Sequence, residues 1–175
     1  MEITDTRSSP HAAAAVTELY AGHALGLVRL AVLLVGDRAS AEDIVQDAFL
    51  GLYRRWDRLP DTSAPLGYLR VSVLNGCRTA LRRRTRTRLA SAAAFTEPPP
   101  AESAEARALL TEEQRAVAVA LRRLPERQRE ALVLRYYLDL SEAEIAATMG
   151  ISRGTVKSAT SRALAAVGRI LKEGS

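Results

Sequence analysis

The feature that most constrains the fold of this chain is the helical spacing of its apolar residues. From about residue 12 to residue 88, and again from about residue 108 to residue 173, apolar side chains recur at steps of three and four. Such steps place them on one face of a helix, whereas a half-buried strand needs alternation, of which we find no convincing case. The sequence therefore predicts an all-α protein.

Three consecutive prolines, at positions 98–100, interrupt this pattern within a stretch rich in alanine, serine and threonine. Proline lacks the backbone donor that a helix interior requires, and a proline run favours an extended spacer. We therefore predict two small helical domains, residues 12–88 and 108–173, joined by a flexible Pro/Ala-rich linker at residues 89–107.

Local signals place several helix ends in the N-terminal half. A first helix is expected over residues 12–35, although Gly22 and Gly26 weaken the expectation that it is unbroken. Ser40 and Asp43 resemble a capping box that starts the second helix. The helical pattern of a third segment is expected to fade after residue 85.

Composition excludes several functional classes. With 47% hydrophobic and 26% charged residues among 175, the chain is typical of a globular protein. Cys77 is the single cysteine, and neither His11 nor His23 has a partner at metal-ligand spacing. We therefore expect no metal, no cofactor and no catalytic residue. The longest apolar run, residues 30–35, is too short to span a membrane, and no signal-peptide core is present, so a cytoplasmic protein without membrane insertion is predicted.

Positive charge is concentrated in two parts of the chain. Residues 62–95 contain seven arginines and no acidic residue, and residues 114–175 contain eleven basic and six acidic residues. Each of these segments follows an acidic one, residues 1–61 and 96–113. Two separate basic segments predict two surfaces that meet a polyanion.

The segment from residue 141 to residue 156 predicts a helix-turn-helix in the C-terminal domain. Ser141 and Glu144 form a capping box, Gly150 supplies a left-handed turn, and Ser152 caps the next helix. The second helix of this motif enters a DNA major groove. Its inward face is expected to carry Val156, Thr160, Ala163, Leu164, Val167 and Leu171.

The outward face of that helix is expected to contact DNA. No acidic residue occurs at positions 145–172, where a carboxylate would be repelled by phosphate. An ordinary helical hairpin with a solvated polar face is the alternative. The candidate contacts are all hydrogen-bond donors: Ser152, Arg153, Thr155, Lys157, Ser158, Ser161 and Arg162.

The N-terminal half offers a basic and an acidic candidate surface. Arg78 and Arg82 are one helical turn apart and project together, although charge alone does not separate nucleic-acid binding from a solvated face. Tyr68 either stacks on an unpaired base or packs in the core. The acidic segment at residues 42–47 either docks a basic protein surface or simply complements a helix dipole.

Together these motifs resemble the extracytoplasmic-function sigma factors of bacteria, and most closely their actinobacterial branch. The resemblance to the second region of that family lies in Leu30-Ala31, Gly36-Asp37-Arg38, Ala41 to Phe49, Trp56, Tyr68-Leu69-Arg70, Asn75 and Arg82-Arg83-Arg84. The resemblance to the fourth region lies in Leu124 to Arg129, Leu134 to Tyr137, Gly154 to Ser158 and Ser161 to Leu164.

The resemblance implies a non-enzymatic subunit that binds core RNA polymerase and directs promoter-specific initiation. The C-terminal domain would read the −35 element and contact the β flap. Many relatives are held by an anti-sigma factor, which is a further candidate partner. The β′ clamp helices would be bound by Asp43, Gln46, Asp47 and Phe49. The −10 DNA would be melted and held by Tyr68, Asn75, Arg78, Arg82 and Arg83.

Other classes make different demands on the sequence. A conventional helix-turn-helix regulator, acting without being a polymerase subunit, would need an apolar pocket or a dimer helix in its N-terminal half. A nucleic-acid enzyme is not expected, because Glu42, Asp43 and Asp47 share one short helix with no His or Lys nearby. An adaptor without DNA contact is disfavoured by the two basic surfaces. Cys77 is either a redox sensor or part of the core.

Overall fold

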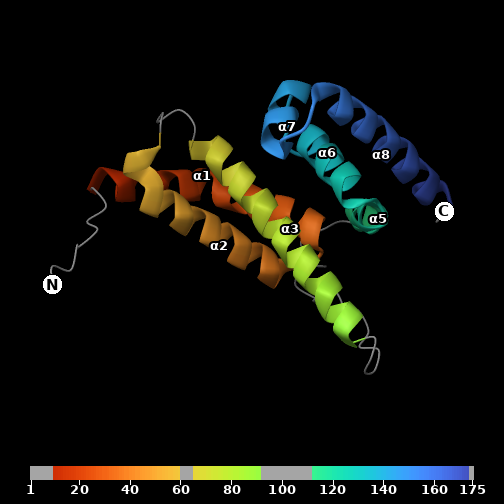
Figure 1. The fold of residues 1–175 in the computed structure, drawn as a ribbon, viewed down its shortest axis with the longest axis horizontal. Coiled ribbons are helices and arrows are strands. Elements are labelled where there is room, and N and C mark those ends of the chain that lie inside the picture. Colours follow the sequence, from red (N-terminus) through yellow and green to blue (C-terminus); the bar gives the residue numbers. More distant parts are fainter. Residues whose placement is uncertain (1–9, 60–64, 92–111, 174–175) are drawn as a thin grey trace.

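The computed structural model describes residues 10–59, 65–91 and 112–173, and every regular element in these ranges is a helix. The all-α prediction is confirmed. Figure 1 shows α1–α3 as one group and α5–α8 as another. Most of the predicted linker, residues 92–107, lies outside the described ranges. The elements are α1 (Pro10–Val35), α2 (Arg38–Arg55), the 3-10 turn η1 (Trp56–Arg58), α3 (Pro65–Ser91), α5 (Glu112–Arg122), α6 (Glu126–Tyr136), α7 (Glu142–Met149) and α8 (Arg153–Glu173).

The first helix, α1, is continuous through both of its glycines. Leu27, Leu30 and Leu34 are buried on the face that packs against α2 and α3. Burying a leucine side chain contributes about 1.5–3 kcal/mol, whereas a glycine inside a helix costs about 1 kcal/mol. Tertiary packing therefore outweighs the weak helix propensity of Gly22 and Gly26.

The start of α2 differs from the sequence prediction. Its N-cap is Asp37, whose Oδ1 accepts a hydrogen bond of 2.8 Å from the backbone N–H of Ser40. Ser40 therefore lies inside the first turn, where its N–H needs an acceptor, and the predicted Ser40–Asp43 capping box is wrong. Gly36, at φ +85°, turns the chain between the two helices.

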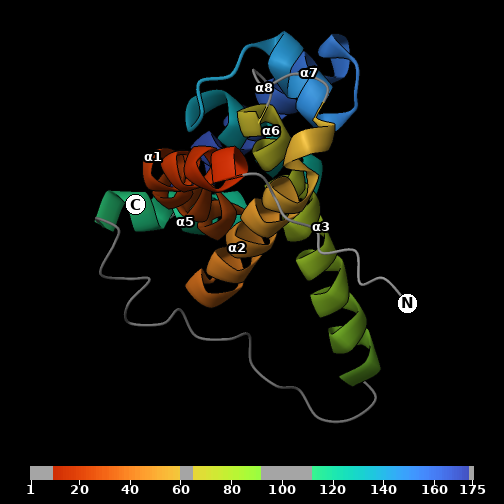
Figure 2. The same cartoon turned by 90° about the vertical axis from the view of Figure 1, so that its left-hand side faces the viewer.

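The third helix, α3, runs to Ser91, three residues past the predicted domain end at residue 88. The threonines that weakened its sequence pattern do not break it. The hydroxyls of Thr85 and Thr87 donate to the carbonyls of the residues four positions earlier, so both side chains are satisfied within the helix. Figure 2 shows the C-terminal end of α3 projecting beyond both helix groups.

The two helix groups are packed against each other. α1 contacts α5 and α6, α3 contacts α7, and one apolar cluster runs through both halves. Within the C-terminal half, α6, α7 and α5 pack on α8 around fully buried Leu134, Ile145 and Val156. The surface of each half that faces the other is therefore partly covered.

Candidate nucleic-acid and protein interfaces

The helix-turn-helix has the geometry that its sequence predicts. The Ser141 Oγ accepts from the Glu144 N–H at 3.3 Å, and the Glu144 carboxylate accepts from the Ser141 N–H at 2.8 Å. Donation from the Ser141 side chain and backbone lowers the pKa of Glu144. Gly150 is left-handed at φ +66°, and the next N–H, that of Ile151, donates to the Ala146 carbonyl. Ser152 Oγ then caps α8 by accepting from the Thr155 N–H at 3.1 Å.

The buried face of α8 differs from the prediction at two residues, because Leu164 is exposed and Ala159 is buried. Leu164 was expected to point inward, but 51% of it is exposed. The buried line instead runs through Val156, Ala159, Ala163 and Val167, at steps of three and four. Because each residue rotates the helix by about 100°, Leu164 lies off the line that contains its neighbour Ala163.

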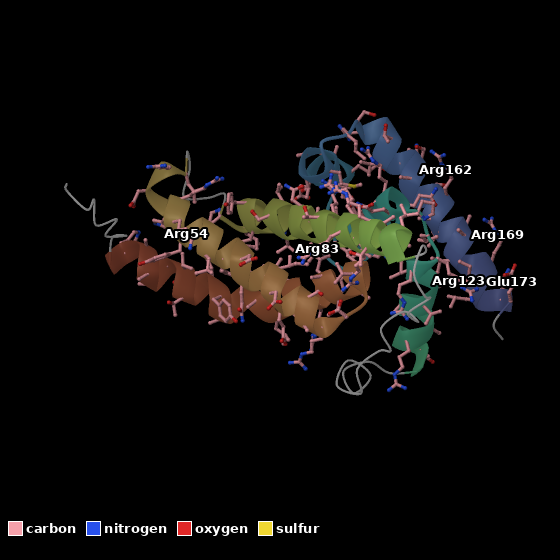
Figure 3. All side chains as sticks on the ribbon, turned by 60° about the horizontal axis from the view of Figure 1, so that its bottom comes forward. Arg54, Arg83, Arg123, Arg162, Arg169 and Glu173 are labelled. Carbon is pink, nitrogen blue, oxygen red and sulfur yellow. The ribbon has the colours of Figure 1, made fainter. Side chains whose placement is uncertain are left out.

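The opposite face of α8 carries the predicted DNA contacts. Arg153, Thr155, Lys157, Ser161 and Arg162 are exposed, and Ser158 is half-buried. Within the described part of the chain, neither Arg153 nor Lys157 has a protein partner. The guanidinium of Arg162 folds back onto Ser158, donating to its carbonyl at 3.1 Å and to its hydroxyl at 3.2 Å. Figure 3 shows Arg162 and Arg169 pointing outward along this helix.

The basic residues of α3 are used differently. Arg82 and Arg83 are exposed, but Arg78 forms a two-point ion pair with Glu130 of α6. Its Nε and Nη2 donate to the two carboxylate oxygens at 2.8 Å each, and its Nη1 donates to the side-chain oxygen of Asn75 at 3.1 Å. Only 3% of the Glu130 side chain is exposed. This hydrogen bond to Glu130 raises the pKa of Arg78.

A neighbouring arginine on α3, Arg84, anchors the corner between α1 and α2. It donates to the Val35 carbonyl at 2.6 Å and to the Ser40 hydroxyl at 3.0 Å, and it pairs with the Asp37 carboxylate. Burial raises the pKa of Asp37, but the Ser40 N–H and Arg84 outweigh it, so the net shift is downward. Arg84 therefore has a structural role that its place in an arginine run does not reveal.

An open hollow of about 460 Å³ lies between α2 and α3. It brings Tyr68, Asn75 and Arg83, predicted to hold −10 DNA, next to Asp47, predicted to bind a protein. Tyr68 is half-buried against the core, and its hydroxyl lies close to Gly51. The core-packing interpretation of Tyr68 thus holds for its buried part, and base stacking by its exposed part stays a prediction. The remaining lining residues are Ile44, Ala48, Ser72, Gly76, Thr79 and Ala80.

The outer face of α2 carries three of the four residues predicted to bind a protein. Asp43, Gln46 and Asp47 are exposed. Phe49 is only 4% exposed and lies edge-on to Tyr20, with ring centroids 4.9 Å apart, so in this structure it packs in the core. Sequence reasoning missed Leu50, which is 50% exposed one turn beyond Gln46. The available sequence signal was an apolar residue four positions after Gln46 and seven after Asp43, which places it on the same helix face.

Comparison with known families decides the identity of this two-part arrangement. The Sigma-70 region 2 model matches residues 19–87, and the Sigma-70 region 4 model matches residues 109–167. The chain is 32% identical over 161 residues to the ECF RNA polymerase sigma factor SigL of Mycobacterium tuberculosis, covering 92% of this chain and 91% of SigL. The chain belongs to the extracytoplasmic-function (ECF) sigma factors.

Other relatives agree with this assignment. The RNA polymerase sigma-E factor of Streptomyces avermitilis is 36% identical over 143 residues, covering 79% of this chain and 75% of that protein. The sigma factor RpoE of Bartonella quintana, solved with the anti-sigma factor NepR, has a TM-score of 0.72 at 27% identity, covering 89% and 96% of the two chains. CnrH, solved with the cytosolic domain of CnrY, has a TM-score of 0.69 at 26% identity, covering 94% and 96%.

The function is accordingly that of an RNA polymerase sigma factor, which binds core polymerase and promoter DNA and acts in transcription initiation. A conventional regulator that acts without polymerase is not favoured. Sigma factors as a class are non-catalytic, soluble initiation factors. Residues 11–35 of this sigma factor form a helix long and apolar enough to cross a membrane by length and composition alone. The apolar face of this helix instead packs against α2 and α3.

Two further expectations from the sequence concern metal binding and the redox role of Cys77. Within the described ranges, no three His, Cys, Asp or Glu side chains form a group that could hold a metal ion. Cys77 is 1% exposed, and burial together with the nearby Glu130 carboxylate raises the pKa of its thiol to about 12. The thiolate required for redox reactions is thus strongly disfavoured in this structure.

Proposed function

We propose that this sigma factor divides promoter recognition and polymerase binding among three helix faces. The observation that carries the proposal is the donor face of α8, where exposed Arg153, Thr155 and Lys157 follow the turn of a helix-turn-helix. The N-terminal residues of such a helix contact base edges in the major groove, and its basic side chains contact phosphates. We assign this face, with Ser152, Ser158, Ser161 and Arg162, to the −35 element.

The hollow between α2 and α3 is assigned to −10 DNA. Extruding a base costs a few kcal/mol, which stacking and polar contacts must offset. Tyr68 offers an aromatic surface beside Asn75, and Arg83 lies on the same hollow. Arg82 adds an exposed positive charge for the backbone, and Arg78 joins this set when it is not paired with Glu130.

The outer face of α2 is assigned to core polymerase, and specifically to the β′ clamp helices. Asp43, Gln46 and Asp47 present acidic and amide groups, and Leu50 adds an exposed apolar contact on the same face. Phe49 supports this face from within by packing against Tyr20. The C-terminal half is assigned a contact with the β flap.

We further propose where this protein acts, how it is regulated and how its chain is divided into domains. It works in the cytoplasm, without catalysis of its own, and an anti-sigma factor regulates it. The two solved relatives, whose structures contain NepR and CnrY, support the last point. The division into domains at residues 12–88 and 108–173, with a linker at 89–107, is supported by family matches at residues 19–87 and 109–167.

The decisive experiment mixes the purified chain with sigma-free core RNA polymerase and measures complex formation together with run-off transcription from genomic promoter fragments. We expect stable binding and new start sites. Tight DNA binding without affinity for core polymerase would contradict the proposal.

Variants then test the assignment of α2. The double variant Asp43→Asn, Gln46→Ala should bind core polymerase less tightly than the wild type. Asp57→Asn is the matched control, because Asp57 is an exposed acidic residue on η1 rather than on the α2 face. If both proteins bind core polymerase like the wild type, the α2 assignment is wrong.

A further inference from the structure

The ion pair between Arg78 and Glu130 joins the two halves of the molecule through residues 52 positions apart in the chain. All three guanidinium nitrogens of Arg78 have protein acceptors, two on Glu130 and one on Asn75. Arginine binds carboxylate and phosphate through the same planar two-point geometry. The Glu130 carboxylate therefore occupies the position in which Arg78 would hold a DNA phosphate.

The closed arrangement also conflicts with simultaneous reading of both promoter elements. The elements named −10 and −35 are about 25 base pairs apart, or about 85 Å of duplex at 3.4 Å per base pair. Here α3, which carries the −10 surface, contacts α7 of the helix-turn-helix. The longest helix of the C-terminal half, α8, has 21 residues and spans only about 32 Å. The two halves must separate before both elements can be bound.

The contacts between the halves can be broken at moderate cost. Arg129 Nη1 donates to the carbonyl of Leu34, near the end of α1, at 2.8 Å. Tyr137, the C-cap residue of α6, forms a side-chain hydrogen bond with Arg29 of α1. The Arg129 Nε, however, is buried without an acceptor among the described residues, and burial lowers the pKa of this arginine. A buried donor without a partner disfavours the closed form, so closure is not an optimised permanent interface.

We propose that the Arg78–Glu130 pair is an internal latch, which holds this sigma factor in a closed form in which Arg78 cannot bind −10 DNA. The inference rests on the proposed function of the α3 surface. Opening frees Arg78 for a phosphate and lets α8 move away from α3. Glu130 is thus an intramolecular competitor of promoter DNA.

The test measures opening and DNA binding separately, on the full chain. Donor and acceptor dyes are attached at Ala21→Cys of α1 and Ala165→Cys of α8, both exposed positions, in a Cys77→Ala background. The probe for DNA binding is a short fluorescein-labelled single strand of mixed sequence, followed by anisotropy. Glu130→Gln removes the latch charge while keeping the shape of the side chain.

Two further variants make the result interpretable. Glu173→Gln changes the net charge by the same amount at the exposed end of α8 and controls for general electrostatics. Tyr137→Phe removes the hydroxyl that bonds Arg29, a second contact between the halves, without changing the net charge, and it carries the test if Glu130→Gln fails to fold. We expect both latch variants to lower energy transfer and to bind the strand several-fold more tightly, while Glu173→Gln behaves like the wild type.

The possible failures point to different conclusions. Unchanged energy transfer in both latch variants would overturn the latch, as would opening without a gain in DNA affinity. Either result is compatible with normal run-off transcription by the wild type, in which case the proposed function stands. Opening with tighter DNA binding, but no transcription by any variant with core polymerase, would instead overturn the proposed function and leave the latch in place.

Discussion

The basic faces of α3 and α8 have similar composition but differ in which charges are available. On α8, Arg153 and Lys157 face solvent without a protein partner in the described chain. On α3, Arg78 is paired with Glu130 and Arg84 with Asp37. Charge density in a sequence therefore indicates a capacity to bind DNA, while residues far away in the chain determine which of the charges are free to do so.

The largest effect should come from removing the free charges on α8. Arg153→Ala combined with Lys157→Ala should weaken promoter binding by about 1–3 kcal/mol per residue that contacts a base, and lower the salt slope by about 1 per lost phosphate contact. Both side chains are exposed, so thermal stability should not change. Fluorescence anisotropy over a salt series measures both quantities. Arg169→Ala, a charge loss farther along α8, is the control, and an equal loss there would contradict the assignment.

The next largest effect should be on stability, at the point where α3 packs closely against α2 beside the hollow. Gly76→Ala places a Cβ 2.6 Å from the Cγ2 of Ile44, so we expect a loss of about 1–3 kcal/mol in the free energy of unfolding. In contrast, Gly67→Ala on the same helix meets nothing within 4 Å and should stabilise by up to about 1 kcal/mol. Urea unfolding measures the two changes, and effects of the same sign would disprove the close crossing.

A smaller effect should separate free from engaged arginines on α3. In the isolated protein, Arg82→Ala should weaken binding of single-stranded DNA several-fold, because Arg82 is exposed. Arg78→Ala removes a charge already paired with Glu130, so its direct effect on binding in the closed form should be smaller. Titrations at low salt, with each protein checked for folding, test this order. Stronger loss in Arg78→Ala would mean that Arg78 is already available.

The smallest effect at neutral pH concerns Cys77, which lies beneath the paired face of α3. Its thiol pKa is raised from 9.0 to about 12, so the folded state retains a proton that the unfolded chain releases. Its contribution to stability should be fully present below pH 9 and decline by about 1.4 kcal/mol per unit as pH rises toward 12. Comparing unfolding of the wild type and Cys77→Ala across this range isolates the contribution. Parallel pH profiles would show that Cys77 is not shielded.

Local sequence signals predicted the helix-turn-helix because each of its determinants acts over a few residues. The Ser141–Glu144 capping box, the left-handed Gly150 and the Ser152 cap all depend on neighbours within four positions. The cap of α2 was misplaced because two local signals compete there. Asp37 and Ser40 are both capping residues, and only the turn at Gly36 decides between them.

Features that depend on packing between segments could not be read in this way. Leu164 is apolar yet exposed, because the buried line of α8 runs through Ala159 and Ala163 instead. The pairing of Glu130 with Arg78 requires knowledge of how the two halves meet. Phe49 was drawn into a predicted binding set by its position in a motif, although its ring is buried against Tyr20.

The three bonds of Arg84 have a mechanical consequence. They fasten α3 to the end of α1 and the start of α2, so α3 cannot slide or roll along α2 without losing them. The outer face of α2 and the hollow beside α3 thus move as one rigid body. When α2 is bound to a partner, the distance from that partner to the site where a DNA strand enters the hollow is therefore set by the dimensions of the protein itself.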